Sequence, residues 1–340
     1  MNGNIPCCLC GKSEISLLSE RDRHGKPLTT VICTGCGLVR HHPLPTPEEV
    51  RQYYEKDYRL DYKKTLAPKP RHIYRAGLVA AQRVKAMNAW LSEARHVLDI
   101  GAGGGELCYM MQGANRQVTG IEPNRGYALH AKEKLGINMV VGDYQTSPLA
   151  PSSFDLITMF HVLEHILEPS KILLQARDWL RPEGHLIVEV PNVEALCGSP
   201  KNRFHFAHIY NFNLATLESL GQRAGFFVRN RYVANDGGII RVVFQKTSKL
   251  SELAPDLGSN AKGIESLLQN HTPLRHLFSH YPYLRLWRKI LRGFDEWTTV
   301  RSTANGETLL GSIKQQLEQT ERFLNRPMSV IRSELSPTRQ

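Results

Sequence analysis

The stretch His96–Met110, which reads HVLDIGAGGGELCYM, decides how this chain folds. Its first five residues predict a strand, the glycines from Gly101 to Gly105 predict a tight turn, and the residues from Glu106 onward favour a helix. Glycine suits such a turn because it accepts positive φ and lets a ligand lie against the backbone. The N–H groups at the start of the helix would then face that ligand.

Further strands follow this unit along the chain. Gln117–Glu122 and Asn138–Asp143 both read as strands that end in an acid, and Phe154–Phe160 reads as a fourth strand. Helical patterns separate the strands, so we expect a parallel sheet that is covered on both faces. One such helix is expected at Arg75–Leu91, before the first strand, because its apolar residues recur at helical spacing.

The end of this region departs from strict alternation. His185–Val190 reads as a strand and Asn213–Ala224 as a helix. Two more strands, Phe226–Val233 and Gly238–Gln245, are joined through a turn that contains Asp236 and two glycines. A hairpin turn at that point makes the last two strands antiparallel.

Together these motifs resemble the class I S-adenosylmethionine-dependent methyltransferases over roughly residues 75 to 246. The order D-x-G-x-G-x-G, with Asp99 before the glycines, and the antiparallel ending separate this resemblance from a dinucleotide-binding domain, in which a similar glycine turn occurs. The resemblance implies an α/β fold with a Rossmann-like seven-stranded sheet whose last strand is antiparallel. It also implies a site for S-adenosylmethionine.

The resemblance assigns cofactor-binding roles to particular residues. The loop glycines would cradle the methionine part, Asp99 would support its amino group, Glu122 would hold the ribose hydroxyls and Asp143 would accept from the adenine amino group. The cofactor-binding residues implied are Asp99, Gly101, Gly103, Gly105, Glu122, Asp143, Tyr144 and Phe160.

Five of the seven cysteines lie within the first 36 residues. Two matching turns, C-x-x-C-G, contain Cys7 with Cys10 and Cys33 with Cys36, and 22 residues separate them. Two such turns complete a tetrahedral four-cysteine zinc site, although a pair of disulfides is the competing interpretation. Short strands expected at 14–20 and 28–32 make this a zinc ribbon, and we expect the metal to be structural.

After the ribbon comes a stiff connector. The pattern C-G-x-V…P-x-P…YY…Y, from Cys36 to Tyr58, resembles the N-terminal part of methyltransferases that act on sugars and on polysaccharide or secondary-metabolite precursors. The expected organisation is a zinc ribbon at 1–45, a linker with a helix at 46–74, a methyltransferase domain at 75–247 and a helical extension at 248–340.

The sequence His161-Val-Leu-Glu164-His165 follows the fourth strand and is expected to open a helix. H-x-x-E-H also occurs in zinc peptidases, but a strand-to-helix junction without a distant acidic ligand helix argues against that interpretation. Within the superfamily that this chain resembles, ubiquinone-pathway and small-RNA methyltransferases carry E-x-x-E-H here and bind a divalent ion, whereas His161 replaces the first acid in this sequence. Three interpretations stay open: an orienting role, a general base, and a second divalent ion at His161, Glu164 and His165. His208 is a further candidate on the acceptor side.

The C-terminal part mixes aromatic and basic residues on helical spacing from Pro273 to Trp297. Leu284, Trp287, Ile290 and Leu291 form one expected stripe, with Arg285, Arg288, Lys289 and Arg292 beside it. This helix could meet an anionic membrane or a phosphate-bearing acceptor, pack on the catalytic domain, or pair two subunits. A last helix at Glu307–Leu324 has heptad-like spacing, which favours a homodimer weakly.

The composition limits the function classes. No apolar run approaches the roughly 20 residues of a membrane span, and the start lacks the apolar segment of a signal peptide, so we expect a cytoplasmic protein. The net charge of +11 makes anionic partners plausible. The expected activity is methyl transfer to a hydroxyl or carbon of a sugar or related small metabolite, with a carbohydrate or small-molecule acceptor. The alternatives are an RNA 2′-O-methyltransferase and a non-catalytic scaffold that binds a ligand.

Overall fold

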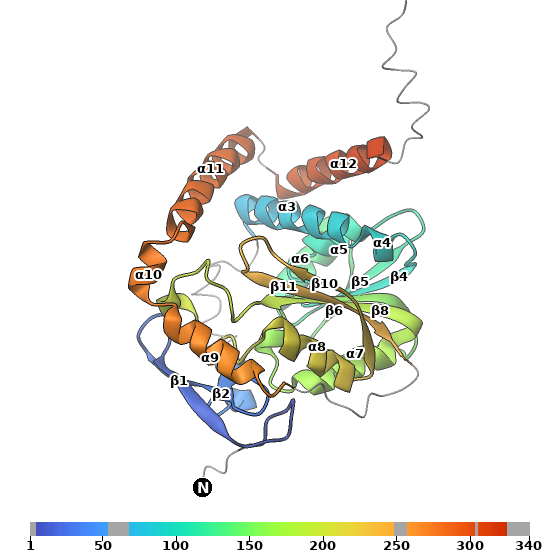
Figure 1. Ribbon diagram of the computed structural model, residues 1–340. Coiled ribbons are helices and arrows are strands. Elements are labelled where there is room, and N and C mark those ends of the chain that lie inside the picture. Colours follow the sequence, from blue (N-terminus) through green and yellow to red (C-terminus); the bar gives the residue numbers. More distant parts are fainter. Residues whose placement is uncertain (1–4, 54–67, 248–256, 303–304, 325–340) are drawn as a thin grey trace, which may run out of the picture.

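The computed structural model describes residues 5–53, 68–247, 257–302 and 305–324. A seven-stranded sheet in the order β10-β11-β8-β7-β4-β5-β6 forms its centre (Figure 1). The strands are β4 (His96–Ile100), β5 (Gln117–Glu122), β6 (Asn138–Val141), β7 (Phe154–Phe160), β8 (Leu180–Pro191), β10 (Phe226–Val233) and β11 (Ile239–Lys246). Neighbours from β8 to β6 are parallel, whereas β11 is antiparallel to both β8 and β10. The predicted α/β fold with its antiparallel strand is therefore confirmed.

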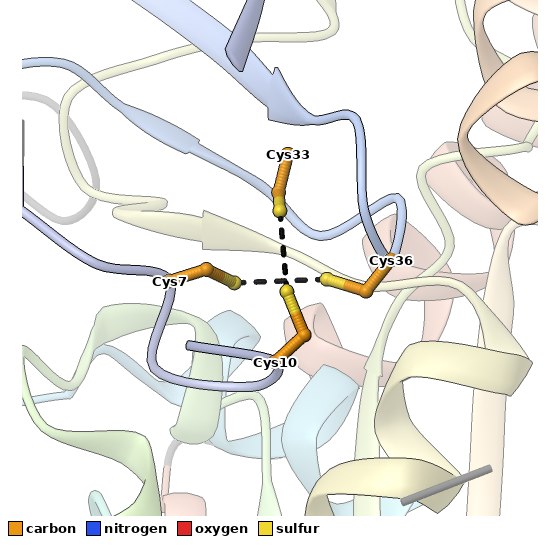
Figure 2. A group of neighbouring side chains, drawn as sticks. All are labelled: Cys7, Cys10, Cys33 and Cys36. Atoms are coloured by element: carbon orange, nitrogen blue, oxygen red, sulfur yellow. Dashed lines mark hydrogen bonds between the residues drawn. The ribbon is translucent and has the colours of Figure 1, made fainter. Parts of the chain in front are cut away.

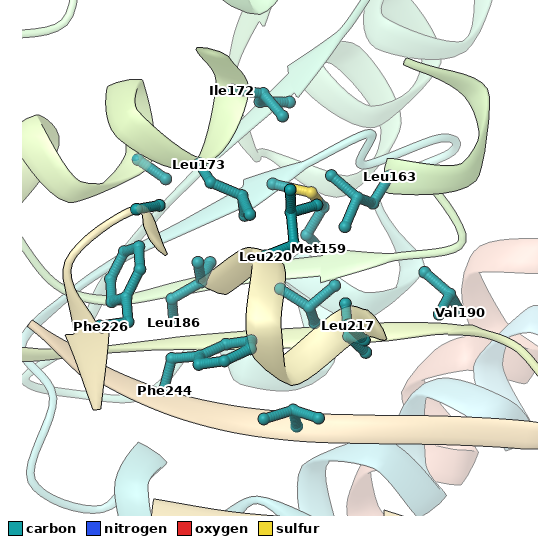
Figure 3. Packing of buried hydrophobic residues seen from close by; sticks show 14 of the residues in the cluster. Met159, Leu163, Ile172, Leu173, Leu186, Val190, Leu217, Leu220, Phe226 and Phe244 are labelled. Atoms are coloured by element: carbon teal, nitrogen blue, oxygen red, sulfur yellow. The ribbon is translucent and has the colours of Figure 1, made fainter. Parts of the chain in front are cut away.

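Helices cover both faces of this sheet. One face carries α3 (Pro70–Ala86), α5 (Glu106–Met111) and α6 (Arg125–Leu135), which contribute to one buried apolar cluster, while α4 (Asn88–Leu91) extends α3. The other face carries α7 (Pro169–Trp179) and α8 (Leu214–Arg223). Figure 3 shows side chains of α7, α8 and the strands gathered in this second cluster. Because helices cover the middle strands on both faces of the sheet, the sequence of β7 is an almost unbroken run of apolar residues.

The N-terminal unit has its own small sheet. It contains β1 (Ile15–Arg21), β2 (Pro27–Cys33) and β3 (Val39–His41), followed by α1 (Pro47–Gln52). Its fourth strand, β9 (Tyr210–Asn211), comes from the segment between β8 and α8 and pairs antiparallel with β3. The sequence predicted the first two strands but neither β3 nor β9. The ribbon is thus joined to the main domain by a shared sheet.

The C-terminal helices run from the ribbon to α3. They are α9 (Asn260–Asn270), α10 (Pro273–Leu277), α11 (Tyr281–Ser302) and α12 (Gly306–Leu324). Ala261 and Ile264 of α9 pack with Ile32 and Val39 of the ribbon. The apolar face of α12, with Leu310 at its centre, packs in the cluster that contains α3. Among the helices described, none has the length and apolar character needed to cross a membrane.

Three local expectations were wrong in detail. The helix expected at Arg75–Leu91 begins at Pro70 and is interrupted at Met87, where φ is −107°. The H-x-x-E-H stretch does not open a long helix: it forms one 3₁₀ turn, η3 (Leu163–His165), and α7 begins only at Pro169. The single helix expected at Pro273–Trp297 is divided into α10 and α11, with a proline in the first turn of each. Residues 54–67 of the expected linker lie outside the described residues.

The packing between α8 and β11 gives a test of the core. A Cβ at Gly221 would overlap the ring of Phe244, and both residues are buried. We expect Gly221→Ala to lower the free energy of unfolding by about 1–3 kcal/mol, because a fully buried ring must shift to admit the added methyl group. Denaturant unfolding measures this. Gly263→Ala on α9 is the matched control: its Cβ would meet nothing within 4 Å, so the helix should gain up to about 1 kcal/mol. Equal stability of Gly221→Ala and the wild type would contradict the packing described.

Candidate functional site

The turn between β4 and α5 is built from glycines in the left-handed region. Gly101, Gly103 and Gly105 have φ values of 75°, 56° and 83°. A Cβ at Gly101 would overlap Val162, and one at Gly105 would lie 2.7 Å from the Cβ of Ala131. At Gly103, by contrast, nothing lies within 4 Å of the Cβ position, so the backbone there faces open space. This loop therefore has the shape of a cradle that a ligand can approach closely.

The carboxylate of Glu122 lies directly beside this loop. The N–H of Gly103 donates to its Oε2 and the N–H of Asn124 donates to its Oε1, each at 2.8 Å. Because a carboxylate oxygen accepts more than one hydrogen bond, Glu122 keeps acceptor capacity for hydroxyl groups. The end of β5 is thus hydrogen-bonded directly to the glycine loop.

Asp143 and Tyr144 follow β6, next to the end of β5. The N–H of Gln145 donates to Asp143 Oδ1 at 3.0 Å, so this carboxylate caps the short helix η2 (Tyr144–Thr146). Tyr144 is buried, and the Gln145 side-chain amide donates to its hydroxyl oxygen at 3.1 Å. The structure therefore places both residues at the sheet edge that carries Glu122, with the Asp143 side chain engaged in a cap.

Asp99 lies beneath the loop and is almost completely buried. The Thr158 hydroxyl donates to Asp99 Oδ1 at 2.7 Å, and the Cys108 thiol lies 3.8 Å from Oδ2. Burial raises the pKa of Asp99 to about 7, although the hydrogen bond from Thr158 opposes that shift. Asp99 thus fastens the end of β4 to β7 and α5.

A cleft of about 400 Å³ opens between α3 and the glycine loop. Asp99, Gly101 and Phe160 contribute to its wall, and so do Arg75 and Arg83 of α3. The Arg83 guanidinium lies 4.3 Å from the centre of the Phe160 ring, within the range of a cation–π contact. The structure thus brings three predicted cofactor residues to one cleft and adds two arginines that the sequence did not single out.

His161 stands at the end of β7 between two buried carboxylates. Its φ of 56° is unusual for a residue with a side chain and costs about 1–2 kcal/mol, which the surrounding contacts must offset. Its Nδ1 lies 3.3 Å from Glu164 Oε1 and its Nε2 lies 3.6 Å from Glu189 Oε1. The side chain of His161 is 36% exposed, whereas those of the two carboxylates are 2% and 3% exposed. His161 is therefore the member of this group that solvent or a substrate can reach.

Glu164, His165 and His208 form the buried end of the same cluster. Glu164 Oε1 lies 3.8 Å from His165 Nε2 and 4.0 Å from His208 Nε2. His165 Nδ1 lies 2.7 Å from the carbonyl oxygen of Ala207, which only accepts, so Nδ1 is the donor and Nε2 is the nitrogen that faces Glu164. The other carboxylate oxygen of Glu164 is buried and has no hydrogen-bond partner. Several acceptors thus converge within 4.8 Å of one another, which suits a cation.

The neighbouring histidines are held neutral. His205 lies against His208, with ring centres 3.8 Å apart. Burial lowers the pKa of His205 to about 3, and the nearby Arg23 adds to this effect. Burial also lowers the pKa of His208 well below its usual value, and His205 contributes in the same direction. Neutral imidazoles can accept a proton or bind a metal, so His208 keeps both capacities.

Sequence reasoning missed Glu189, on β8, and its partners. Arg83 donates to Glu189 Oε1 at 2.6 Å, and Arg241 of β11 donates to Oε2. These two guanidinium groups lower the pKa of Glu189 against the opposing effect of burial, which is the largest single influence. The signal in the sequence was a lone acid within the apolar strand LIVEV, because such a residue is buried only when it is paired.

The four predicted cysteines lie together in the ribbon. Figure 2 shows their sulfur atoms pointing toward one another, with Cys7 and Cys36 Sγ atoms 3.6 Å apart and those of Cys10 and Cys33 3.4 Å apart. A disulfide bond measures about 2.05 Å, so these are free thiols. Tetrahedral zinc with bonds of about 2.3 Å places its sulfur ligands roughly 3.8 Å apart, close to the separations here. Cys8 is not part of the group.

The sheet order and the glycine cradle are those of the Rossmann-like methyltransferases. Residues 71–230 match the family model described as a methyltransferase domain.

Relatives with curated names agree with this class. A protein of Mycolicibacterium smegmatis named "Probable S-adenosylmethionine-dependent methyltransferase" is 27% identical over 140 residues, which cover 40% of this chain and 53% of that protein. A ubiquinone biosynthesis O-methyltransferase of Photobacterium profundum is 31% identical over 108 residues, which cover 30% of this chain and 46% of that protein. The chain thus spans about half the length of these relatives.

Among solved structures, a similar one is the Burkholderia thailandensis 1,6-didemethyltoxoflavin-N1-methyltransferase with bound 1,6-didemethyltoxoflavin and S-adenosylhomocysteine. It is 18% identical, the alignment covers 62% of this chain and 96% of that one, and the TM-score is 0.47.

The thiol cluster gives a prediction about metal content. We expect the purified protein to contain one zinc ion per chain, and Cys36→Ser to lose it and to melt at a lower temperature, because three thiolates and a hydroxyl hold zinc poorly. Elemental analysis and a thermal melt measure both effects. Cys8→Ser, a change within the same turn, is the control and should keep the metal. Loss of zinc from Cys8→Ser but not from Cys36→Ser would show that the ligand set is wrong.

The contact between Glu122 and the glycine loop predicts the effect of losing that carboxylate. We expect Glu122→Ala to weaken S-adenosylhomocysteine binding by roughly 10- to 100-fold, since a hydrogen bond to a charged group contributes about 1.5–3 kcal/mol. Isothermal titration calorimetry measures this affinity. Glu133→Ala, on the exposed side of α6, is the control and should bind as the wild type does. An affinity within about twofold of the wild type for Glu122→Ala would remove the ribose assignment.

Proposed function

We propose that this protein is an S-adenosylmethionine-dependent methyltransferase that acts on a hydroxyl or a carbon of a sugar or related small metabolite, free or linked to a nucleotide or lipid. The observation that carries this proposal is the position of the histidine–carboxylate cluster. Val162, in the turn after His161, contacts Gly101 of the loop, so the cluster stands beside the cradle. The cofactor would supply an electrophilic methyl group, and the protein must align the acceptor and remove one proton when the acceptor is a hydroxyl.

In this proposal the cradle and the strand ends hold the cofactor. The backbone around Gly103 would receive the methionine part, Glu122 would bind the ribose hydroxyls, and Asp143 and Tyr144 would hold the adenine. Asp99 keeps the loop in shape through Thr158 and Cys108. Phe160, fixed by Arg83, forms part of the wall of the cleft that would receive the cofactor.

His161 is the proposed proton acceptor. It is the most exposed member of the cluster, and each ring nitrogen lies near a carboxylate, Glu164 on one side and Glu189 on the other. A carboxylate close to one nitrogen orients the ring and stabilises the imidazolium that forms when the other nitrogen takes a proton. His208 would then contact the acceptor or complete the orientation of Glu164.

A divalent ion at the same cluster is the second way to activate a hydroxyl. The convergence of Glu164, His165 and His208 within 4.8 Å, and the buried carboxylate oxygen without a partner, favour it. An ion held there, with His161 at its edge, would polarise the acceptor oxygen and lower its pKa.

The proposed acceptor class rests on two supports. The pattern that runs from the zinc ribbon into the connector resembles enzymes that modify sugars, with Zn²⁺ in the ribbon as a structural ion. The relatives named ubiquinone biosynthesis O-methyltransferases favour oxygen as the acceptor atom. An RNA 2′-hydroxyl is the second candidate, favoured by the net charge of +11.

A labelling experiment separates these acceptors. The protein is incubated with S-adenosylmethionine labelled in its methyl group and an extract of cells that lack it, with and without prior ribonuclease treatment. We expect ribonuclease-resistant label in small or lipid-extractable molecules, and a rate reduced roughly 10²- to 10⁴-fold in His161→Asn, because a general base contributes about that factor. His24→Asn, at an exposed histidine in the β1–β2 turn, is the control.

Two other outcomes would change the conclusion. Label that disappears after ribonuclease treatment would make RNA the acceptor. An activity that survives in His161→Asn but is abolished by a chelator, and restored by a divalent ion, would assign the chemistry to the metal.

A further inference from the structure

The helix α11 presents its apolar side away from the protein. At 100° per residue, its large apolar residues fall within about 160° of the helix circumference. We call them the α11 face: Tyr283, Leu284, Leu286, Trp287, Ile290, Leu291, Phe294 and Trp297. Their exposed fractions lie between 43% and 67%. Leu274, Leu277 and Phe278, in and just after α10, are exposed as well. Single exposed apolar residues are ordinary, but a continuous set of this size marks an interaction site.

The polar side of α11 is the side that holds it to the domain. Glu296 is buried and pairs with Arg75 of α3, and the Tyr74 hydroxyl donates to Asp295 at 2.9 Å. An ordinary amphipathic helix packs the other way, with its apolar stripe toward the core. Figure 1 shows α11 joining α10 to α12 at the edge of the molecule, away from the sheet. The acidic groups of α11 thus face α3, while its apolar face is left for a partner.

The charge of this segment indicates the partner. Residues 273–302 contain six lysines and arginines and two acids, and both acids are the ones that contact α3. The basic residues Arg285, Arg288, Lys289 and Arg292 lie on the arc opposite the apolar face, an arc that also carries Asp295 and Glu296. A helix with Trp, Phe and Leu on one side and Lys and Arg on the other is suited to lie in the plane of a lipid interface.

We infer that the α11 face is a docking surface for a membrane that carries anionic lipids. A dimer that pairs two α11 faces would cover the apolar residues but would offer no opposite charge to the basic residues, which lie on the other side of the helix. Anionic headgroups instead neutralise those charges, and Trp and Tyr side chains favour the boundary between headgroups and acyl chains.

Docking would also place the cleft near the lipid. Arg75, which holds Glu296 of α11, lines the cleft beside the glycine loop. Access to a lipid-linked acceptor would follow, a consequence that rests on the proposed function. The binding itself does not depend on catalysis, so the two can fail separately.

Vesicle binding tests this inference. The full-length protein is sedimented with phosphatidylcholine vesicles made with or without phosphatidylglycerol. Two of the four tryptophans belong to the α11 face, so their fluorescence should shift to shorter wavelength on binding. We expect binding only when phosphatidylglycerol is present, weakening as salt rises, and reduced at least about tenfold in the double variant Trp287→Asp/Phe294→Asp.

Controls separate docking from misfolding. Leu174→Asp, at a residue of α7 with 47% exposure, adds the same kind of charge elsewhere and should bind as the wild type does. Circular dichroism and S-adenosylhomocysteine affinity should be unchanged in the double variant, because the two positions are 60% and 67% exposed. The inference is overturned if the wild type does not bind anionic vesicles, or if the double variant binds them as well as the wild type does. A dimer that dissociates in the double variant, without vesicle binding by the wild type, would identify the face as a contact between two copies.

Discussion

The parallel pairing of β4 with β5 and β7 is the constraint on which the candidate site depends. Parallel strands bring their carboxyl ends to one edge of a sheet; the glycine loop and His161 follow such ends, and Glu122 is the last residue of β5. The N–H groups of Gly101 and Ala102 both donate to the Ile121 carbonyl at 2.9 Å, which fixes the loop against β5. A shift of one residue in this register would turn Glu122 to the other face of the sheet. The cradle and its carboxylate are therefore consequences of strand register.

The N-terminal ribbon is connected to the candidate site through the small sheet that contains β3 and β9. Because β3 pairs with β9, the segment just before β9, which carries His205 and His208, is held from the ribbon side. The N–H of Arg23, in the β1–β2 turn, donates to the Phe204 carbonyl at 2.8 Å and adds a second tie. A structural metal that fixes the ribbon would thus also fix His208 relative to Glu164. The cysteine cluster would in this way help to position a residue of the candidate site without itself touching a substrate.

The sequence predicted those features of the structure that are determined by residues close together along the chain. The seven strands, the glycine turn and the grouping of His161, Glu164 and His165 follow from local pattern, and the structure has them. The ion pairs of Glu189 with Arg83 and Arg241 join residues 106 and 52 positions apart, and no local pattern specifies them. The two-residue strand β9 is too short for a period to be detected. The role of each site residue stays a prediction, since position alone does not assign chemistry.

The orientation of α11 relative to the domain could not be predicted from its sequence. The spacing of apolar residues shows that a helix has an apolar face and how wide that face is. It does not show whether the face points toward the protein or away from it, because this depends on the contacts of the polar face. Here Arg75 and Tyr74 engage the two acids of the polar side, and this decides the orientation. In α12 the same kind of stripe packs inward in the cluster with α3, where Leu310 is buried. Two adjacent helices of similar amphipathicity therefore face opposite ways, and the contacts of Arg75 and Tyr74 with the acids of α11 account for the difference.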